Sequence, residues 1–445
     1  MKFNIYKLII VIIISGMIYG CEDRLELDPA QSISGDLAVV SESNIENILI
    51  GTYDESGQGP SYGGQLQMMA DLLGGGSAST WGGTFIQPRQ VKNKTMLPDN
   101  TFVRNFWNNS YEVINQANLV LDNIAIVTSS ADRKNNVEGQ AKFLRALTYF
   151  DLVRHFASGN MGVPLRVNGI LDYSVDLSVA RSDASSIYSQ IVSDLQSAIG
   201  LLPESNDFFA DKYAAQALLA RVYLYQGNYA GARDAANAVI TSSGHGLAAT
   251  YADAFNNDSD GSENIFSFQV TSQTGSNQLN TFYADEGNGG RGGDVTVTDD
   301  YIALFDDSAD ERANFFYESA QNGGRLTTKY KNEFANIPLI RMAEMFLIRA
   351  EGNVEMGTSM GDTPLNDLNA LRARSSSASL MGDVTKSMVL NERLLELSFE
   401  GFSIHDVVRT QGSVDGFSFD APEITMPIPL AEMDTNPLMV QNPGY

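Results

Sequence analysis

The sequence predicts a mainly α-helical fold, in which tetratricopeptide-like helix pairs form an α-α superhelix and a loop-rich variable region carries short strands. Three observations lead to this prediction. Apolar residues recur at helical spacing over much of the chain. Two segments resemble alanine-rich helix pairs of the tetratricopeptide type. Two long stretches rich in glycine and polar residues interrupt the helices.

The chain begins with a segment that predicts a secretory signal. Two lysines accompany the unbroken apolar run 8–14, which is shorter than the roughly 20 residues needed to span a hydrocarbon core. Ile18-Tyr19-Gly20 precedes Cys21, the only cysteine, as in a lipoprotein signal. We therefore expect residues 1–20 to be removed and Cys21 to carry acyl chains such as palmitate, which would anchor the protein to a membrane. The alternative is an ordinary cleaved signal that leaves a free thiol.

Residues 21–241 are expected to form the N-terminal helical region. Segments 109–127 and 143–150 place apolar residues at i, i+3, i+4 and i+7, which is typical of amphipathic helices. A third helix is expected to begin after Asp183, a residue type suited to an N-cap, and to end before Pro203.

Segments 211–241 and 338–374 each resemble a pair of antiparallel helices. In the first pair, the turn Gly227-Asn228-Tyr229 separates two alanine-rich stretches. Small residues on the facing sides allow the two helices to approach closely, as in tetratricopeptide repeats. Such repeats alone indicate a helical scaffold for interactions.

Two regions lack helical periodicity. Residues 51–105 contain Gly74-Gly75-Gly76 and Trp81-Gly82-Gly83, and residues 242–337 contain the strand-like run 265–268. Both regions are rich in aromatic residues, so we expect ordered loops with a functional role. We accordingly divide the chain into a signal (1–20), an N-terminal helical region (21–241), a variable ligand-side region (242–337) and a C-terminal region (338–445).

Charge and cysteine content exclude some classes of function. The formal net charge is −25 at pH 7, so the surface repels phosphate backbones and nucleic-acid binding is not expected. With a single cysteine, the chain forms no internal disulfide.

The C-terminal region carries a specific resemblance. The stretch 391–401 (NERLLELSFEG) is similar to the "ER-x-x-E-L-x-F-E-G" signature of the SusD/RagB family of outer-membrane nutrient-binding lipoproteins. Residues 341–351 (RMAEMFLIRAE) resemble the family's "R-x-A-E-x-x-L-x-x-A-E" helix, and residues 426–445 resemble its terminal motif. Ser403 stands where the family usually has arginine. The resemblance extends over the mature chain, in order.

This resemblance implies a lipid-anchored protein, exposed on the outer membrane, that captures a glycan or oligosaccharide and delivers it to a TonB-dependent, SusC-like transporter. It implies neither enzymatic activity nor a cofactor. Two alternatives stay open. One is a peptide-binding uptake lipoprotein of the same architecture, and the other is an adaptor whose tetratricopeptide groove binds another protein.

Trp81 is the first candidate for ligand contact, because an indole flanked by glycines is suited to stack on a sugar ring. A second candidate patch is the loop that contains Tyr283, Asp285, Asn288 and Arg291, where an aromatic ring, a carboxylate and a guanidinium could bind hydroxyl groups. Arg89, Lys92 and Lys94 form a small basic cluster near Trp81.

Other conspicuous residues are expected to be structural. Trp107 is assigned to the core, and the signature charges are expected to form ion pairs between packed helices. His155, His245 and His405 lack the spacing of a metal site or a catalytic triad. Segment 256–261 partly resembles a calcium loop but lacks its final carboxylate, so no metal site is predicted. The signature charges are Arg341, Glu344, Arg349, Glu351, Glu392, Arg393, Glu396 and Glu400.

Overall fold

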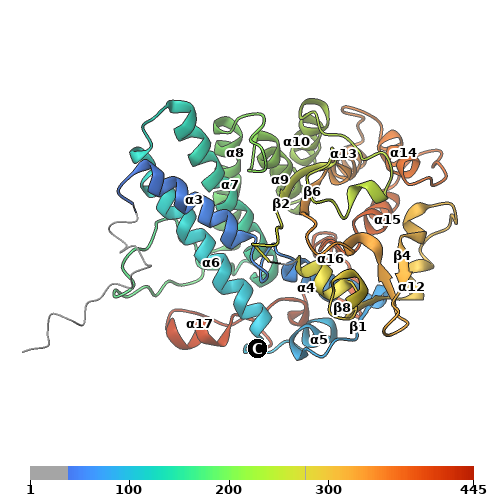
Figure 1. Ribbon diagram of the computed structural model, residues 1–445, viewed down its shortest axis with the longest axis horizontal. Helices are drawn as coiled ribbons and strands as arrows, with labels where there is room; N and C mark the ends of the chain where they lie inside the picture. The colour runs from blue at the N-terminus through green and yellow to red at the C-terminus, as the bar shows by residue number, and fades with distance from the viewer. Residues whose placement is uncertain (1–38, 276) are drawn as a thin grey trace, which may run out of the picture.

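The computed structural model describes residues 39–275 and 277–445, and it confirms a mainly α-helical fold. Figure 1 shows the longer helices side by side in a curved array, with shorter helices and strands gathered at one end. Cys21 and the signal lie outside the described residues. Among the residues described, no helix has the length and apolar character to cross a membrane.

The array is formed by helices that pack mainly on their sequence neighbours. α3 packs on α6, α6 on α7, α7 on α8, α8 on α9, α9 on α10 and α10 on α13. This pattern of successive neighbours is that of stacked helix pairs. The bounds are α3 (Glu42–Ser56), α6 (Thr101–Asp122), α7 (Ala131–Phe156), α8 (Ala184–Leu201), α9 (Lys212–Tyr225), α10 (Tyr229–Ser242) and α13 (Met342–Met356).

Shorter helices complete the molecule around this array. α14 and α15 pack on α13, and α16 packs on α4. Their bounds are α4 (Gln65–Gly74), α5 (Ile86–Asn93), α11 (Gln278–Tyr283), α12 (Asp299–Ile302), α14 (Pro364–Arg374), α15 (Lys386–Leu397), α16 (Ser403–Arg409) and α17 (Leu430–Thr435).

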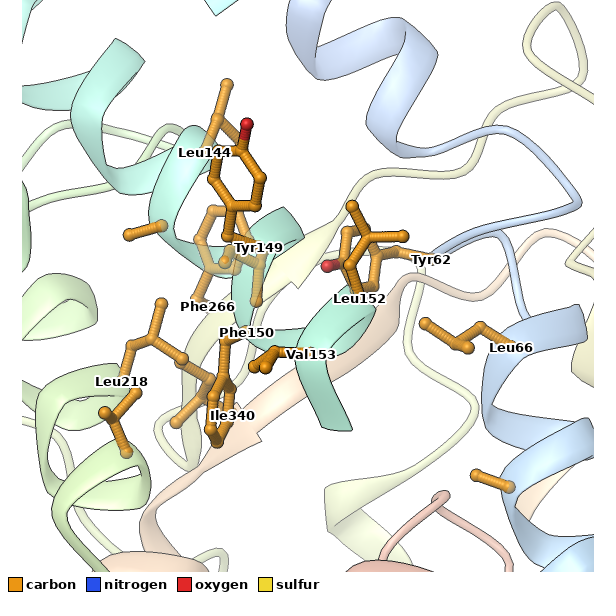
Figure 2. Packing of buried hydrophobic residues seen from close by; sticks show 14 of the residues in the cluster. Tyr62, Leu66, Leu144, Tyr149, Phe150, Leu152, Val153, Leu218, Phe266 and Ile340 are labelled. Atoms are coloured by element: carbon orange, nitrogen blue, oxygen red, sulfur yellow. The ribbon is translucent and has the colours of Figure 1, made fainter. Parts of the chain in front are cut away.

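The main core lies between α7, α9 and a two-stranded ribbon. Figure 2 shows Phe150 of α7 near Leu218 of α9 and Ile340 of β6, all of them buried. Phe143 packs edge-on against Phe266 of β2 at 4.9 Å between ring centroids. The alanine-rich face of α9 lies against α10, as the tetratricopeptide-like pattern predicts.

The strands of the described chain form four antiparallel ribbons of two strands each, and three of them lie in or border the variable region. These ribbons join segments that are distant in sequence. In particular, β1 pairs with β3 and β2 pairs with β6. The bounds are β1 (Ser79–Trp81), β2 (Asn264–Phe268), β3 (Val295–Val297), β4 (Phe316–Glu318), β5 (Arg325–Thr327), β6 (Ile337–Arg341), β7 (Ser413–Val414) and β8 (Phe417–Ser418).

The structure differs from the sequence prediction in residues 51–105. This stretch was expected to be a loop, yet it contains α4 and α5. Residues 66–73 of α4 are all buried, including the polar Gln67 and Asp71, and the glycines on both sides of this helix indicate a loop in the sequence. Asp183 does occupy the N-cap of α8, but its side chain makes no capping hydrogen bond.

Candidate ligand-binding surface

The ribbon β1–β3 brings the N-terminal loop and the variable region together. Trp81 lies opposite Val295 in this ribbon, and the backbone N–H of Gly82 donates to the carbonyl of Asp294 at 2.7 Å. Two segments more than two hundred residues apart therefore form one surface. This surface holds Trp81 and Arg291, which the sequence singled out separately.

Trp81 belongs to a cluster of aromatic rings and is not isolated in a flexible loop. Its indole N–H donates to the carbonyl of Phe85 at 3.1 Å, and its ring lies 5.9 Å from that of Phe282. Phe282 also contacts Phe85 and Phe102, at 6.4 and 6.1 Å between centroids. Trp81 is half-buried, whereas Phe85 is 41 % exposed.

Arg291 covers one side of this aromatic cluster. Its guanidinium carbon lies 4.1 Å from the centroid of Phe85, which is cation–π geometry. The guanidinium also pairs with Asp294 at 3.0 Å and donates to the hydroxyl of Thr84 at 3.0 Å. Burial raises the pKa of Asp294, and the charge of Arg291 opposes this shift. The Arg291 side chain is 29 % exposed, so part of it faces solvent.

The rest of the second patch needs correction. Tyr283 is completely buried, and its hydroxyl donates to Asp71 at 2.8 Å. Asp285 is 5 % exposed and accepts a hydrogen bond from the amide of Asn288 at 2.7 Å. Tyr283, Asp285 and Asn288 hold the loop together, and they leave Arg291 as the member of the predicted patch that faces the aromatic cluster.

The basic cluster near Trp81 is likewise engaged inside the protein. Lys94 is 4 % exposed and pairs with Asp415 at 2.6 Å. Lys92 donates to the carbonyl of Gly76, and Arg89 donates to the carbonyl of Gly83 at 2.8 Å. The hydrogen bonds and the ion pair of these cations stabilise the loop 76–94, so the three side chains do not form an open site for an anion.

The surface thus offers aromatic rings, a guanidinium and polar loop edges. Trp81 and Phe85 present apolar ring area, while Arg291 and the nearby threonines supply hydrogen-bonding groups. Such a combination suits a flat ligand that has apolar faces and a hydroxyl-rich edge. Sequence reasoning did not single out Phe85 as part of the site, because only the fold shows that it lies under Arg291.

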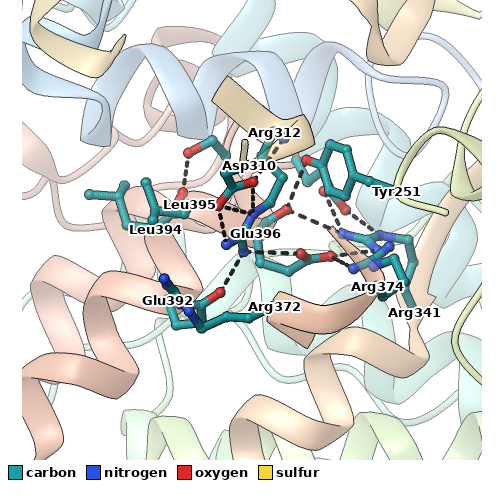
Figure 3. Close-up of polar contacts among 12 residues, drawn as sticks. Tyr251, Asp310, Arg312, Arg341, Arg372, Arg374, Glu392, Leu394, Leu395 and Glu396 are labelled. Atoms are coloured by element: carbon teal, nitrogen blue, oxygen red, sulfur yellow. Dashed lines mark hydrogen bonds and ion pairs between the residues drawn. The ribbon is translucent and has the colours of Figure 1, made fainter. Parts of the chain in front are cut away.

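The signature charges lie in a buried network, as expected. Figure 3 shows Glu396 between Arg374, Arg341 and Arg312, with nitrogen–oxygen distances of 2.5, 3.2 and 3.5 Å. Burial alone would raise the pKa of Glu396, but the three arginines and Lys329 lower it to about 2. This carboxylate is therefore ionised at neutral pH and fixes the position of α15.

Further pairs join the helices in the same way. Arg349 pairs with Asp367 at 2.5 Å, Arg409 with Glu351 at 2.5 Å, and Arg221 with Glu344 at 2.6 Å. These side chains are buried and engaged by protein partners. The structural interpretation of the signature is confirmed. Trp107 is also confirmed as a core residue, with 2 % exposure.

The histidines are not all isolated, which corrects the sequence interpretation. His155 and His405 lie edge to face at 4.7 Å, and together with Asp151 they place ligand-type atoms within 4.8 Å of one another. Burial lowers the pKa of both histidines, that of His155 to about 4. Arg154 pairs with Asp151, so a positive charge already occupies this cluster. We assign the cluster to the packing of α7 against α16.

The segment that resembles a calcium loop uses its oxygens within the protein. The amide oxygen of Asn256 accepts from the backbone of Lys331 at 2.6 Å, and Asp260 accepts from Asn336 at 3.0 Å. The loop is thereby fastened to the segment that precedes β6.

Comparisons with known proteins identify the family of this chain and support its fold. Residues 25–224 match a family model described as "SusD-like_3: Starch-binding associating with outer membrane", and residues 315–420 match the model "SusD_RagB: SusD family". The chain is similar to SusD-like protein P2 of Formosa agariphila, with 26 % identity over 99 % of each chain. It is also similar to the starch-binding protein SusD of Bacteroides thetaiotaomicron, with 28 % identity over 29 % of this chain and 25 % of that protein. A crystal structure of a SusD superfamily protein from Bacteroides vulgatus superimposes with a TM-score of 0.81 at 25 % identity, over 91 % of this chain and 99 % of that one.

Proposed function

We propose a function from the following premise: this chain belongs to the SusD/RagB family. The protein captures a glycan at the cell surface and passes it to a SusC-like, TonB-dependent transporter in the outer membrane. It acts by binding alone, without catalysis. The description of the family model as starch-binding and the similarity to a starch-binding protein support a carbohydrate ligand.

The observation that carries this proposal is the partly exposed aromatic surface of Trp81 and Phe85 with Arg291 beside it. A pyranose ring has an apolar face that stacks on an aromatic side chain, and its hydroxyl groups accept hydrogen bonds from a guanidinium. Because the internal contacts of Phe282 and Thr84 fix these groups, the surface is preorganised for binding and loses little freedom when a ligand arrives.

A lipid anchor at Cys21 would keep this surface close to the transporter. The apolar run before Cys21 is too short to span a membrane, and acyl chains on the cysteine would give stable attachment. Tethering also raises the local concentration of captured glycan near the transporter, which favours uptake without a new contact.

A glycan array and a peptide library, probed with the same detergent-extracted protein, test the nature of the ligand. Binding to glycans and not to peptides is expected. Binding to peptides alone would refute the proposal in favour of a peptide-uptake lipoprotein. Co-purification of a TonB-dependent transporter after mild detergent extraction is expected, and a protein that is extracted without any transporter would contradict the delivery role.

A further inference from the structure

Asp294 is a buried carboxylate beside the indole of Trp81. It is 8 % exposed, it directly precedes β3, and its main-chain carbonyl accepts from the N–H of Gly82 at 2.7 Å. A Cβ atom on Gly83 would lie 2.5 Å from Cζ2 of Trp81 and 2.6 Å from Cγ of Asp294. The indole and the carboxylate therefore both border Gly83, so the carboxylate belongs to the same surface as the indole.

The carboxylate of Asp294 has a single cation as its partner. Its Oδ2 atom lies 3.0 Å from Nε of Arg291, which is its one ion pair within residues 39–275 and 277–445. In that same part of the chain, Oδ2 accepts no hydrogen bond. A buried charge is costly unless an opposite charge compensates it, so the ionised form of Asp294 depends on Arg291.

The orientation of Arg291 depends on Asp294 in turn. Besides the ion pair, Nη2 of Arg291 donates to the hydroxyl of Thr84 at 3.0 Å, and the ring of Phe85 lies against the face of the guanidinium. Contacts at the face and at two nitrogen atoms hold a planar guanidinium in one orientation. Among the residues described, Nη1 has no hydrogen-bond acceptor, so this atom remains available to donate to a ligand.

The ion pair also sets the local charge of the aromatic surface. Arg291 and Asp294 together are neutral, whereas the chain as a whole carries a formal charge of −25, whose field repels anions. The guanidinium of Arg89 donates to the carbonyl of Gly83 at 2.8 Å, so it contacts the loop backbone. A neutral sugar, whose hydroxyl groups accept hydrogen bonds from Arg291, therefore fits this surface better than a sugar that carries a carboxylate.

We propose that Asp294 is a positioning residue that sets the charge selectivity of the glycan surface. It orients Arg291 for hydrogen bonds to the hydroxyl groups of a neutral sugar. Its negative charge compensates the guanidinium, so an anionic sugar finds no unpaired cation there. This inference rests on the proposed function, and it goes beyond that function by naming the class of glycan, which is uncharged.

Asp294→Asn tests this role, because asparagine has nearly the same shape as aspartate but no charge. In this variant the guanidinium of Arg291 keeps its charge without compensation, so carboxylated sugars should bind better relative to neutral ones. Asp132→Asn, in the exposed first turn of α7, makes the same change in net charge away from the surface and is the matched control. Arg291→Gln removes the group through which Asp294 acts.

The probes are neutral oligosaccharides printed on an array, including malto- and laminari-oligosaccharides. Each is printed beside a form whose primary hydroxyl groups are oxidised to carboxylates. Methyl esters of the oxidised forms restore neutrality, so they separate the effect of charge from that of shape. The dissociation constants of the neutral and the carboxylated form are compared for each variant, and thermal melting checks folding.

The wild type and Asp132→Asn are expected to bind the neutral and esterified forms more tightly than the carboxylated forms. In Asp294→Asn, the ratio of the two dissociation constants should shift roughly tenfold towards the carboxylated form, because a hydrogen bond to an ionised acceptor is about twice as strong as a neutral one. Arg291→Gln should weaken both forms by a similar factor. Adding Asp294→Asn to Arg291→Gln should change the binding of neutral sugars little further, because Asp294 acts through Arg291.

The outcomes separate the two proposals. A wild type that binds no glycan refutes the proposed function and this inference together. A wild type that prefers carboxylated sugars, or an Asp294→Asn variant with an unchanged ratio, refutes the role of Asp294 alone. An equal shift in Asp132→Asn also refutes it, because net charge would then be the cause. If Asp294→Asn does not fold, Arg291→Gln decides, since a loss confined to carboxylated sugars would make Arg291 an anion receptor and overturn the proposal.

Discussion

Replacing Trp81 by alanine should weaken glycan binding and cost a moderate amount of stability. The indole loses its hydrogen bond to Phe85, worth about 0.5–1.5 kcal/mol, and its ring contact with Phe282, worth about 0.5–1.5 kcal/mol. Trp81→Ala should therefore lower the free energy of unfolding by about 1–3 kcal/mol. If the indole is also a platform for a sugar, the variant loses roughly 1–3 kcal/mol of binding free energy, which is about a 5- to 150-fold rise in Kd.

Two matched variants make this test sharp. Trp81→Phe keeps an aromatic ring but removes the indole N–H, so it should lose about 1 kcal/mol of stability and retain most of the binding. Trp107→Ala truncates a tryptophan that is 2 % exposed, so it should cost about 3–5 kcal/mol of stability and leave the binding of the folded fraction unchanged.

The assay is calorimetric titration of a glycan identified on the array, together with urea unfolding of each variant. The reasoning fails if Trp81→Ala binds the glycan as tightly as the wild type. It also fails if Trp107→Ala loses binding while it remains folded, because the ligand would then contact the other tryptophan.

Three further predictions concern the buried network and the anchor. Glu396→Gln leaves Arg374 and Arg341 without their common carboxylate, so the free energy of unfolding should fall by about 3–5 kcal/mol in urea titrations; a loss below about 1 kcal/mol would contradict the network's importance. The stability of the wild type should decline in acid, because the pKa of Glu396 is lowered from 4.5 to about 2 and that of Glu400 is also lowered on folding. These two carboxylates contribute fully to the free energy of unfolding above about pH 4.5, and their contribution is lost as the pH falls towards 2. A free energy of unfolding that does not change over this pH range would refute this contribution. Finally, Cys21→Ala should release the folded protein from washed outer membranes, and protease added to whole cells should digest the wild type; a variant that still sediments with membranes would show that no lipid anchors it.

The sequence predicted the helical scaffold better than the ligand surface, for a physical reason. The helices α6, α8 and α10 each carry a one-sided apolar pattern or an alanine-rich face, which the sequence alone displays. The helix α4 was missed because it is short and lies between Gly64 and Gly75, and glycine-rich sequence is typical of loops.

The candidate site depends on contacts between distant segments, which periodicity does not encode. Trp81 and Arg291 were singled out as unusual residues in glycine-rich loops, but only the pairing of β1 with β3 places them on one surface. Tyr283 and Asp285 belonged to the second candidate patch in the sequence, yet Tyr283 donates to Asp71 and Asp285 accepts from Asn288 inside the protein. Composition cannot distinguish a loop residue that faces solvent from one whose hydrogen bonds inside the protein stabilise the loop.

The ribbon of β2 and β6 also affects how the sequence of this protein can change during evolution. It joins residues 264–268 to 337–341, so the chain between them begins and ends at one point on the helical array. The entropic cost of closing such a loop rises by only about 0.6 kcal/mol for each doubling of its length. Insertions and deletions within this closed segment can therefore remodel the surface around Arg291 while the base of the segment stays fixed. New specificities can arise there without a new scaffold.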